Sequence, residues 1–329
     1  FNAMRSHLIQ KGHAVTVFNP WNRELFPLSQ FDVIHYFSCI DPFFWNFVKT
    51  QSSKTPLVVT PTYRQEKSIR NRARLLGKRL RQSVFPSGPL YDLPDLWLPN
   101  TEIEARDLET YQGVTHRKIH VLPNGVENHF LQASPEPFLA TLSMKPPFIL
   151  NVGRFHPVKN QLTLIEAVRR AGLKCVFIGS PDMEHQSYYQ SCVQAARQAE
   201  ASDPGRKVQF LFVDPIPHHS PLLPSAYASA AAFVLPSHFE TFGLSALEAA
   251  IASPRLILTQ NMASHDIFKD IARFVDPFNP EEIRHTILEV LREPAHPKKS
   301  QVLFDKYNWN KICDLLVDHY SDLRRTLPK

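Results

Sequence analysis

The sequence predicts an α/β protein with two domains, each built on a parallel sheet of the doubly wound type. Short apolar runs rich in Val, Ile, Leu and Phe alternate with helical patterns almost throughout the 329 residues. Continuously apolar runs of this length are typical of strands buried on both faces, and their alternation with helices favours parallel sheets. A proline-rich break at residues 134–147 divides the runs into two series, which indicates two domains joined by a linker.

The first series predicts an N-terminal domain at residues 1–136. Residues Phe1 to Lys11 have the pattern of the middle of a helix, so we expect this domain to lack its first strand and helix in the sequence given. Five strands are expected after that helix, at Ala14–Phe18, Val33–Tyr36, Leu57–Thr60, Leu96–Pro99 and Ile119–Leu122.

The second series predicts a domain at residues 147–308, followed by a helix at Trp309–Arg325. Ligands of such sheets bind beyond the carboxyl ends of the strands, so two facing sheets would form a cleft between the domains. The strands of the second domain are expected at Phe148–Val152, Lys174–Ile178, Val208–Phe212, Ala232–Leu235 and Arg255–Leu258.

Composition excludes several classes of protein. The chain is 43% hydrophobic and 21% charged, which fits a globular protein and argues against disorder. Its four cysteines lie far apart and form no metal-ligand spacing, which argues against a disulfide framework or structural zinc and favours a cytoplasmic compartment. No apolar run approaches the roughly 20 residues that span a bilayer, and no signal peptide pattern opens the chain.

The net charge of +6 is concentrated in residues 64–82, where eight Lys and Arg residues stand against the single acid Glu66. Apolar residues recur there at helical spacing, so the segment predicts a basic amphipathic helix. Such a helix could dock on an anionic membrane surface or an acidic acceptor, or it could be a solvated surface helix. Nucleic-acid binding is disfavoured, because aromatic residues are not interleaved with the basic ones.

The first candidate site follows the expected strand Phe148–Val152. Gly153 and Arg154 end that strand, and Lys159 precedes a helix that begins near Gln161. Two cations beside the positive end of a helix could bind a diphosphate. An ordinary loop with solvated basic residues is the alternative.

The second candidate site follows the expected strand Ala232–Leu235. Glu240 lies in the loop after it, Gly243 allows a ligand to approach the backbone, and Glu248 falls on the second turn of the next helix. The two glutamates could be a helix cap and a solvated residue. The apolar residues around Glu248 favour burial instead, and a buried carboxylate needs partners such as hydroxyl groups.

These segments resemble those of family-4 retaining glycosyltransferases. The two glutamates in PSHFETFGLSALEA are separated by seven residues, like the EX7E signature of that family, and NVGRFHPVKNQLTLIEAV resembles its GR…K segment. KIHVLPNGVENHF, DVIH, RFVDPFNPEEI and YNWNKI resemble further family segments in the same order. The resemblance extends over essentially the whole chain after residue 3.

The resemblance implies the GT-B fold, with two Rossmann-like domains facing each other across a cleft and residues 309–329 packing back on the first domain. It implies a hexosyltransferase of polysaccharide biosynthesis that moves a sugar from a nucleotide-diphosphate sugar to a glycan, lipid-linked or other hydroxyl acceptor. Anomeric configuration would be retained, and neither a metal nor a cofactor would be needed. The protein could lie peripherally on the inner face of the membrane.

The resemblance also assigns roles to single residues. Arg154 and Lys159 would neutralise the donor diphosphate, Glu240 would bind hydroxyl groups of the transferred sugar, and Glu248 would accept hydrogen bonds from the ribose. Further contacts to the donor are expected from Gly153, Ser180, Thr241, Phe242, Gly243 and Leu244.

Two departures from the family pattern concern the acceptor side. The glycine-rich loop that usually opens the family does not occur in the sequence given, and Thr62 stands where the family often has a histidine. His35 is a poor substitute, since a histidine at a strand end is more often a satisfied core residue. Two alternatives therefore stay open: a non-catalytic or truncated nucleotide-sugar-binding protein, and a GT-B epimerase or phosphorylase.

Overall fold

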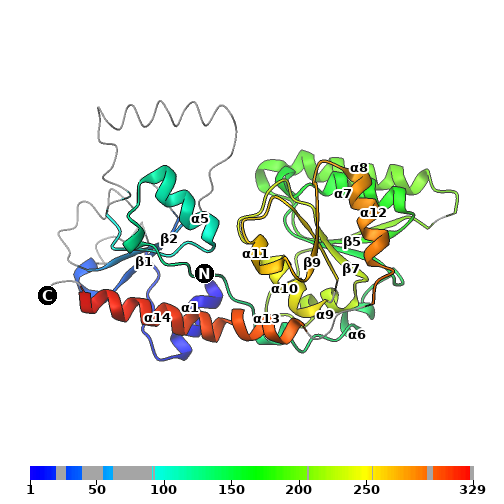
Figure 1. The fold of residues 1–329 in the computed structure, drawn as a ribbon. Coiled ribbons are helices and arrows are strands. Elements are labelled where there is room, and N and C mark those ends of the chain that lie inside the picture. The colour runs from blue at the N-terminus through cyan, green and yellow to red at the C-terminus, as the bar shows by residue number, and fades with distance from the viewer. Residues whose placement is uncertain are drawn as a thin grey trace. The chain divides into compact units, whose positions relative to one another are not determined.

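The structure, a computed structural model, describes residues 1–19, 27–38, 55–61, 91, 93–205, 207–253, 255–294 and 299–326. The chain divides into two compact units (Figure 1). Unit 1 consists of Phe1–Gly125 and Trp309–Lys329, and unit 2 consists of Val126–Asn308. The expected basic helix at 64–82, which contains all the excess positive charge, lies outside the described residues, as does Thr62.

Unit 2 contains a six-stranded parallel sheet with the strand order β6-β5-β4-β7-β8-β9. The chain builds β4, β5 and β6 outward in one direction and then returns to place β7, β8 and β9 on the other side of β4. The strands are β4 (Ile149–Val152), β5 (Lys174–Ile178), β6 (Gln209–Val213), β7 (Ala232–Leu235), β8 (Leu256–Thr259) and β9 (Ala272–Val275).

Helices cover both faces of this sheet, because alternate residues of each buried strand point to opposite sides. Phe233 and Leu235 of β7 pack with α9 and α10 on one face, while Ala232 and Val234 pack with α7, α8 and α12 on the other. The helices are α6 (Glu136–Leu139), α7 (Gln161–Ala171), α8 (Gln186–Ala201), α9 (Leu222–Ser229), α10 (Leu244–Ala252), α11 (His265–Phe268), α12 (Pro280–Val290) and α13 (Lys299–Tyr307).

Local sequence signals fix the ends of several of these helices. The Asn279 side chain accepts a hydrogen bond from the Glu282 amide, and Pro280 follows as the first helical residue, so α12 begins there. Helix α7 ends at Gly172, whose left-handed backbone (φ 66°) is the usual conformation after a helix C-terminus.

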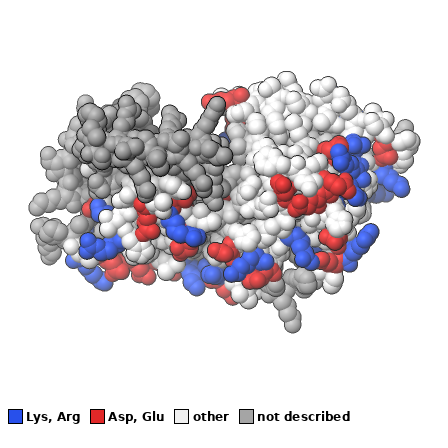
Figure 2. Space-filling view, turned by 45° about the horizontal axis from the view of Figure 1, so that its top comes forward, with Lys and Arg blue, Asp and Glu red and all other residues white. Residues whose placement is uncertain are grey.

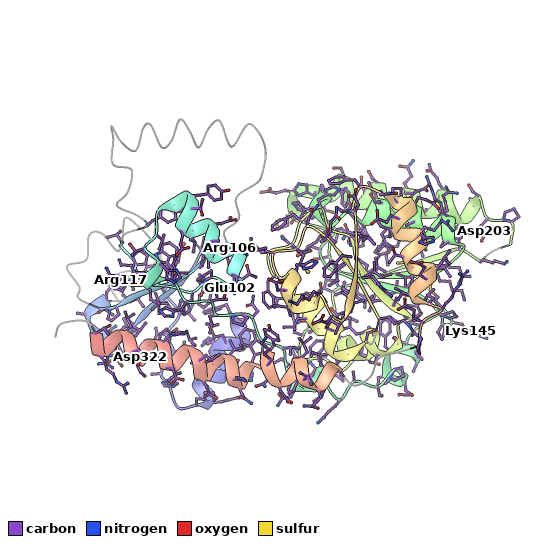
Figure 3. All side chains as sticks on the ribbon, viewed as in Figure 1. Glu102, Arg106, Arg117, Lys145, Asp203 and Asp322 are labelled. Carbon is purple, nitrogen blue, oxygen red and sulfur yellow. The ribbon has the colours of Figure 1, made fainter. Side chains whose placement is uncertain are left out.

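Unit 1 contains a three-stranded parallel sheet with the order β1-β2-β3. Val58 of β2 packs on one face with α1 and α14, while Val59 packs on the other face with α5. Both α5 and α14 also present exposed charged side chains, among them Glu102, Arg106 and Asp322 (Figure 3). The elements are β1 (Ile34–Phe37), β2 (Leu57–Thr60), β3 (Leu96–Trp97), α1 (Asn2–Gln10), α5 (Glu102–Asp107) and α14 (Trp309–Thr326).

Helix α14 completes the core of unit 1 although it follows unit 2 in the sequence. Its Ile312, Cys313 and Leu316 are fully buried in a cluster with residues of α1 and β2. Trp309, at its start, lies so close to Gly125 that a Cβ atom at Gly125 would be 2.6 Å from the indole ring. A larger residue at position 125 therefore cannot fit without moving the helix.

Three sequence expectations need correction. Residues 14–18 form no strand: Val15 is partly buried against the core of unit 1, so the apolar pattern reflects packing and not pairing. Residues 119–122 contribute one isolated bridge, between Ile119 and Trp97, because β3 is only two residues long. Strand β9 was missed, since it contains the exposed Arg273 and does not have a continuous apolar pattern.

The remaining strands lie at or within one or two residues of their expected positions. Residues 126–136, assigned by the sequence to the first domain, pack with unit 2, because Val126 and Phe130 are buried in its core. Within the described part of the chain, none of the helices has both the length and the apolar character needed to cross a bilayer.

Candidate functional site

The candidate residues gather where the strand order of unit 2 reverses. Strands β4 and β7 are neighbours in the sheet, although β5 and β6 lie between them in the sequence. The loops after β4 and β7 therefore leave the same edge of the sheet side by side, at the position where doubly wound folds bind their ligands. The His238 amide donates to the Val158 carbonyl (2.8 Å) and joins the two loops directly.

Asn160 fixes the loop after β4. Its backbone is left-handed (φ 58°, ψ 37°), a conformation that asparagine tolerates better than most residues. The buried side chain donates to the carbonyls of Pro236 (3.0 Å) and Pro277 (2.7 Å) and accepts from the Thr163 hydroxyl. The loop that carries Lys159 is thus tied to the ends of two other strands.

Lys159 and Glu240 form a short ion pair at this edge. The Lys159 ammonium lies 2.6 Å from Glu240 Oε1, and the same oxygen accepts a hydrogen bond from the Ser237 hydroxyl (2.6 Å). Ser237 and Glu240 are buried, whereas the Lys159 side chain is 23% exposed. The carboxylate is therefore held from two sides, while the cation keeps access to solvent or a ligand.

The segment after Glu240 offers backbone groups to a ligand. Gly243 has φ 76°, a left-handed conformation that favours glycine, whereas a Cβ atom there would only have to displace the flexible end of the Met262 side chain. Helix α10 begins at Leu244, and the amides of a first helical turn lack intrahelical acceptors. Phe242 points into the core, so only its backbone can serve a ligand; Thr241 is partly buried and Leu244 is exposed.

Glu248 lies one turn further along α10 and is also buried. Its Oε2 accepts a hydrogen bond from the hydroxyl of Tyr227 on α9 (2.8 Å), and Tyr227 is fully buried. Its Oε1 lies 3.2 Å from His218 Nδ1, in the loop between β6 and α9. This hydrogen bond with Glu248 raises the pKa of His218.

Arg154 is held differently from Lys159. Its guanidinium pairs with Asp182 Oδ2 (2.8 Å), and its side chain is 67% exposed. Asp182 is kept ionised: hydrogen bonds from the Glu184 amide and His185 lower its pKa, and Arg154 lowers it further. The Phe155 amide donates to the Ser180 carbonyl (2.8 Å) and the Gly153 amide to the Ile178 carbonyl, so Gly153 and Ser180 lie on adjoining strand ends.

Among the described residues, His156, Asp182 and His185 form a group that could hold a metal ion, with ligand atoms within 4.8 Å of one another. Each member already has a partner. His156 Nδ1 accepts a hydrogen bond from the Val158 amide, and Asp182 lies between Arg154 and His185. In the structure these atoms order the loop that carries Arg154.

The structure brings Lys159 into contact with Glu240 and places the other expected residues on the same strand ends or on α10. Sequence reasoning gave no role to Asn160, Ser237, Asp182, His218 or Tyr227. Ser237 and Asp182 could have been found, since each follows a buried strand of the same sheet. His218 and Tyr227 carry no local signal, because their proximity to Glu248 depends on how α9 packs against α10.

On the face shown in Figure 2, acidic and basic side chains are interspersed over the described surface. No broad positive surface is visible among the described residues on that face. Selectivity for an anion would come from the arrangement of individual groups at the strand ends.

Comparison with known proteins identifies the family. Residues 136–308 match the model of glycosyl transferases group 1, and residues 18–130 match that of glycosyltransferase family 4. A D-inositol 3-phosphate glycosyltransferase of Geodermatophilus obscurus is 30% identical over 270 residues, which cover 77% of this chain and 58% of that protein. Its counterpart in Mycolicibacterium smegmatis is 26% identical over 238 residues, which cover 70% and 53%. The chain spans about half the length of these curated relatives.

Solved structures share the fold. Sucrose-phosphate synthase from Thermosynechococcus elongatus superposes with a TM-score of 0.73 at 18% identity, covering 92% of this chain and 76% of that chain. Anabaena HepE in complex with UDP-glucose gives a TM-score of 0.68 at 14% identity, covering 97% and 88%. The predicted GT-B fold with two Rossmann-like domains is confirmed, and so is the resemblance read from the sequence. The chain belongs to the group 1 glycosyl transferases.

Proposed function

We propose that this protein transfers a sugar from a nucleotide-diphosphate sugar to a hydroxyl acceptor, with retention of anomeric configuration and without a metal. The observation that carries the proposal is the Lys159–Glu240 pair at the switch point of the sheet in unit 2, beside the N-terminus of α10. A cation, a buried carboxylate and a helix N-terminus there match the needs of a sugar linked to a diphosphate.

The donor is assigned to these groups by their charge. Lys159 and Arg154 would bind the diphosphate, since the ammonium keeps access to solvent and the guanidinium is mostly exposed. Glu240 would accept hydrogen bonds from hydroxyl groups of the sugar, and Glu248 from the ribose. Anabaena HepE, which has the same fold, is solved with UDP-glucose, and this supports a nucleotide sugar as the donor.

The proposed reaction breaks the bond between the anomeric carbon and the diphosphate oxygen and forms a bond from that carbon to the acceptor oxygen on the same face. The electron pair leaves with the nucleoside diphosphate, whose developing charge Arg154 and Lys159 stabilise in place of a metal. The acceptor proton passes to the departing phosphate oxygen. This route needs no glycosyl-enzyme, and Glu240 Oε1 already accepts hydrogen bonds from Lys159 and Ser237.

The acceptor is assigned only by class. The relatives are named for transfer to D-inositol 3-phosphate, which supports a hydroxyl acceptor such as a glycan or a polyol. A lipid-linked acceptor and a position on the inner face of the membrane stay predictions from the basic segment 64–82, which lies outside the described residues.

The test is to incubate the chain with UDP-, GDP- and ADP-sugars and candidate acceptors, with and without EDTA, and to measure released nucleoside diphosphate. We expect release that depends on the acceptor and persists in EDTA, with a retained anomer by NMR. Nucleotide binding without release would favour the non-catalytic alternative. Inversion, or loss of activity in EDTA, would contradict the proposed mechanism.

A further inference from the structure

Glu248 is held by two partners of opposite character. Tyr227 is fully buried on α9, and burial together with Glu248 raises the pKa of its phenol, so it remains a neutral donor. His218 sits in a loop with its side chain 75% exposed. Tyr227 therefore fixes the carboxylate permanently, whereas His218 can leave it at little cost.

Contacts within unit 2 hold the loop so that His218 faces Glu248. The His218 carbonyl accepts a hydrogen bond from His129 Nε2 (2.9 Å), which anchors the backbone while the imidazole faces the carboxylate. Two carboxylates act on the ring, Glu248 on α10 and Glu127 in the segment before His129, and the titratable His219 is the next residue in the sequence. Both glutamates raise the pKa of His218, Glu248 by the larger amount.

We propose that His218 is a positioning residue that competes with the ribose of the donor for Glu248. The inference rests on the proposed function, in which Glu248 accepts hydrogen bonds from the ribose hydroxyls. It makes nucleotide affinity depend on the protonation of a loop residue that does not bind the phosphates.

The competition is for the negative charge of the carboxylate and not for a vacant acceptor position. The two oxygens accept about four hydrogen bonds, and Tyr227 on Oε2 and His218 on Oε1 use two of them. A ribose diol could therefore still donate one hydrogen bond to each oxygen. Those bonds are weaker when a protonated His218 is paired with Oε1 than when Glu248 keeps its full charge.

Protonated His218 neutralises Glu248 and holds its Oε1. Neutral His218 gives at most an ordinary hydrogen bond, and its exposure lets it move into solvent. Nucleotide binding should therefore strengthen as the pH rises through the raised pKa of His218.

The experiment compares the full chain with His218→Asn, which can still donate to Glu248 but does not titrate. His219→Asn is the control, since His219 is also exposed and is adjacent in the sequence. Dissociation constants of UDP, GDP and ADP are measured by calorimetry from pH 5.5 to 8.5. Between these limits the affinity of the wild type should gain about fivefold more than that of His218→Asn, the scale of an exposed ion pair. His219→Asn should follow the wild type.

Other histidines lie near the site, so only the difference between the wild type and His218→Asn is diagnostic. Identical pH profiles for the two would overturn the role of His218 while leaving the donor site intact. A uniform change at every pH would mean that His218 only supports its loop. No binding of any nucleotide would instead remove the proposed donor site, and the role of His218 with it.

Discussion

Both units hold polar side chains beside a parallel sheet, but in unit 2 these side chains are charged and in unit 1 the corresponding group is neutral. In unit 2, Glu240 is buried next to the cation of Lys159, and Lys159 retains some exposure. In unit 1, His35 of β1 contacts the Tyr320 hydroxyl through Nδ1 (2.6 Å) and Thr60 through Nε2 (2.8 Å). Burial lowers the pKa of His35 to about 3, so this histidine is neutral.

The difference separates a structural polar group from a candidate site. Both ring nitrogens of His35 have protein partners, so neither is left to exchange a proton with a substrate. Lys159 and Glu240 neutralise each other. A ligand that carries both phosphate and hydroxyl groups could take the place of each partner, the phosphate at Lys159 and the hydroxyl groups at Glu240. A position at a sheet edge is therefore not enough to identify a ligand-binding residue. Its protein partners must also be ones that a ligand can replace.

The strongest test of the structural role of His35 is the pH dependence of stability. Because its pKa is lower in the folded than in the unfolded chain, His35 supports folding fully above about pH 6.5, and this support is lost as the pH falls towards 3. We expect the free energy of unfolding to fall by up to about 5 kcal/mol at the acid limit, about 2 kcal/mol of it by pH 5.

Tryptophan fluorescence during urea unfolding can measure this effect in unit 1 alone, because Trp21, Trp45, Trp97 and Trp309 all fall within its sequence ranges. The variant His35→Gln should have a flatter dependence of unfolding free energy on pH between 7 and 5. Equal slopes for the variant and the wild type would mean that His35 is not held neutral by the folded structure.

Glu240→Ala tests the other side of the comparison. Removing the carboxylate takes away the proposed sugar contact and the partner of Lys159, so kcat should fall by about 100- to 1,000-fold. Circular dichroism and thermal melting should show that the fold is kept. Undiminished activity would leave Glu240 a structural residue like His35.

Lys159→Ala should weaken nucleotide binding by roughly 10- to 100-fold, corresponding to the roughly 1.5–3 kcal/mol of a charge-assisted contact. Calorimetry with the preferred nucleoside diphosphate measures this. The matched control is Lys145→Ala, an exposed lysine of unit 2 labelled in Figure 3, which should bind like the wild type. An equal loss in both variants would indicate general electrostatics and not a site.

The smallest effect is expected from Asp182→Asn. The Arg154 side chain is mostly exposed, so its ion pair with Asp182 is weak, and freeing the guanidinium should tighten nucleotide binding by no more than about fivefold. Titration of the variant with the same nucleotide checks the direction. Weaker binding would show that Asp182 orients Arg154 for the ligand and does not compete with it.

The parts of the fold that could be predicted are those encoded locally. Strands such as Leu57–Thr60 and Ala232–Leu235 are buried on both faces and therefore read as continuous apolar runs. Strand β9 does not have a continuous apolar pattern because it contains an exposed arginine. Residues 14–18 wrongly predict a strand, because the apolar pattern there reflects the packing of the partly buried Val15.

The charged residues of the candidate site could also be predicted from local sequence, but their partners could not. Arg154, Lys159, Glu240 and Glu248 could be named from their positions after strands and from the resemblance. Their partners could not, since Tyr227 reaches Glu248 from 21 residues away through the packing of two helices. The sequence thus indicates which groups carry charge, and the tertiary structure determines how each charge is held.

The return of α14 to unit 1 has a consequence for the order of events during synthesis. Unit 2 is one continuous segment, so it can fold as soon as it has left the ribosome, whereas unit 1 lacks a core helix until residues 309–326 are made. At about 5–20 residues per second, the N-terminal segment waits roughly 10–40 s for that helix. During this interval the apolar residues of α1 and β2 that α14 will cover, such as Met4 and Val58, are available to chaperones or to other nascent chains.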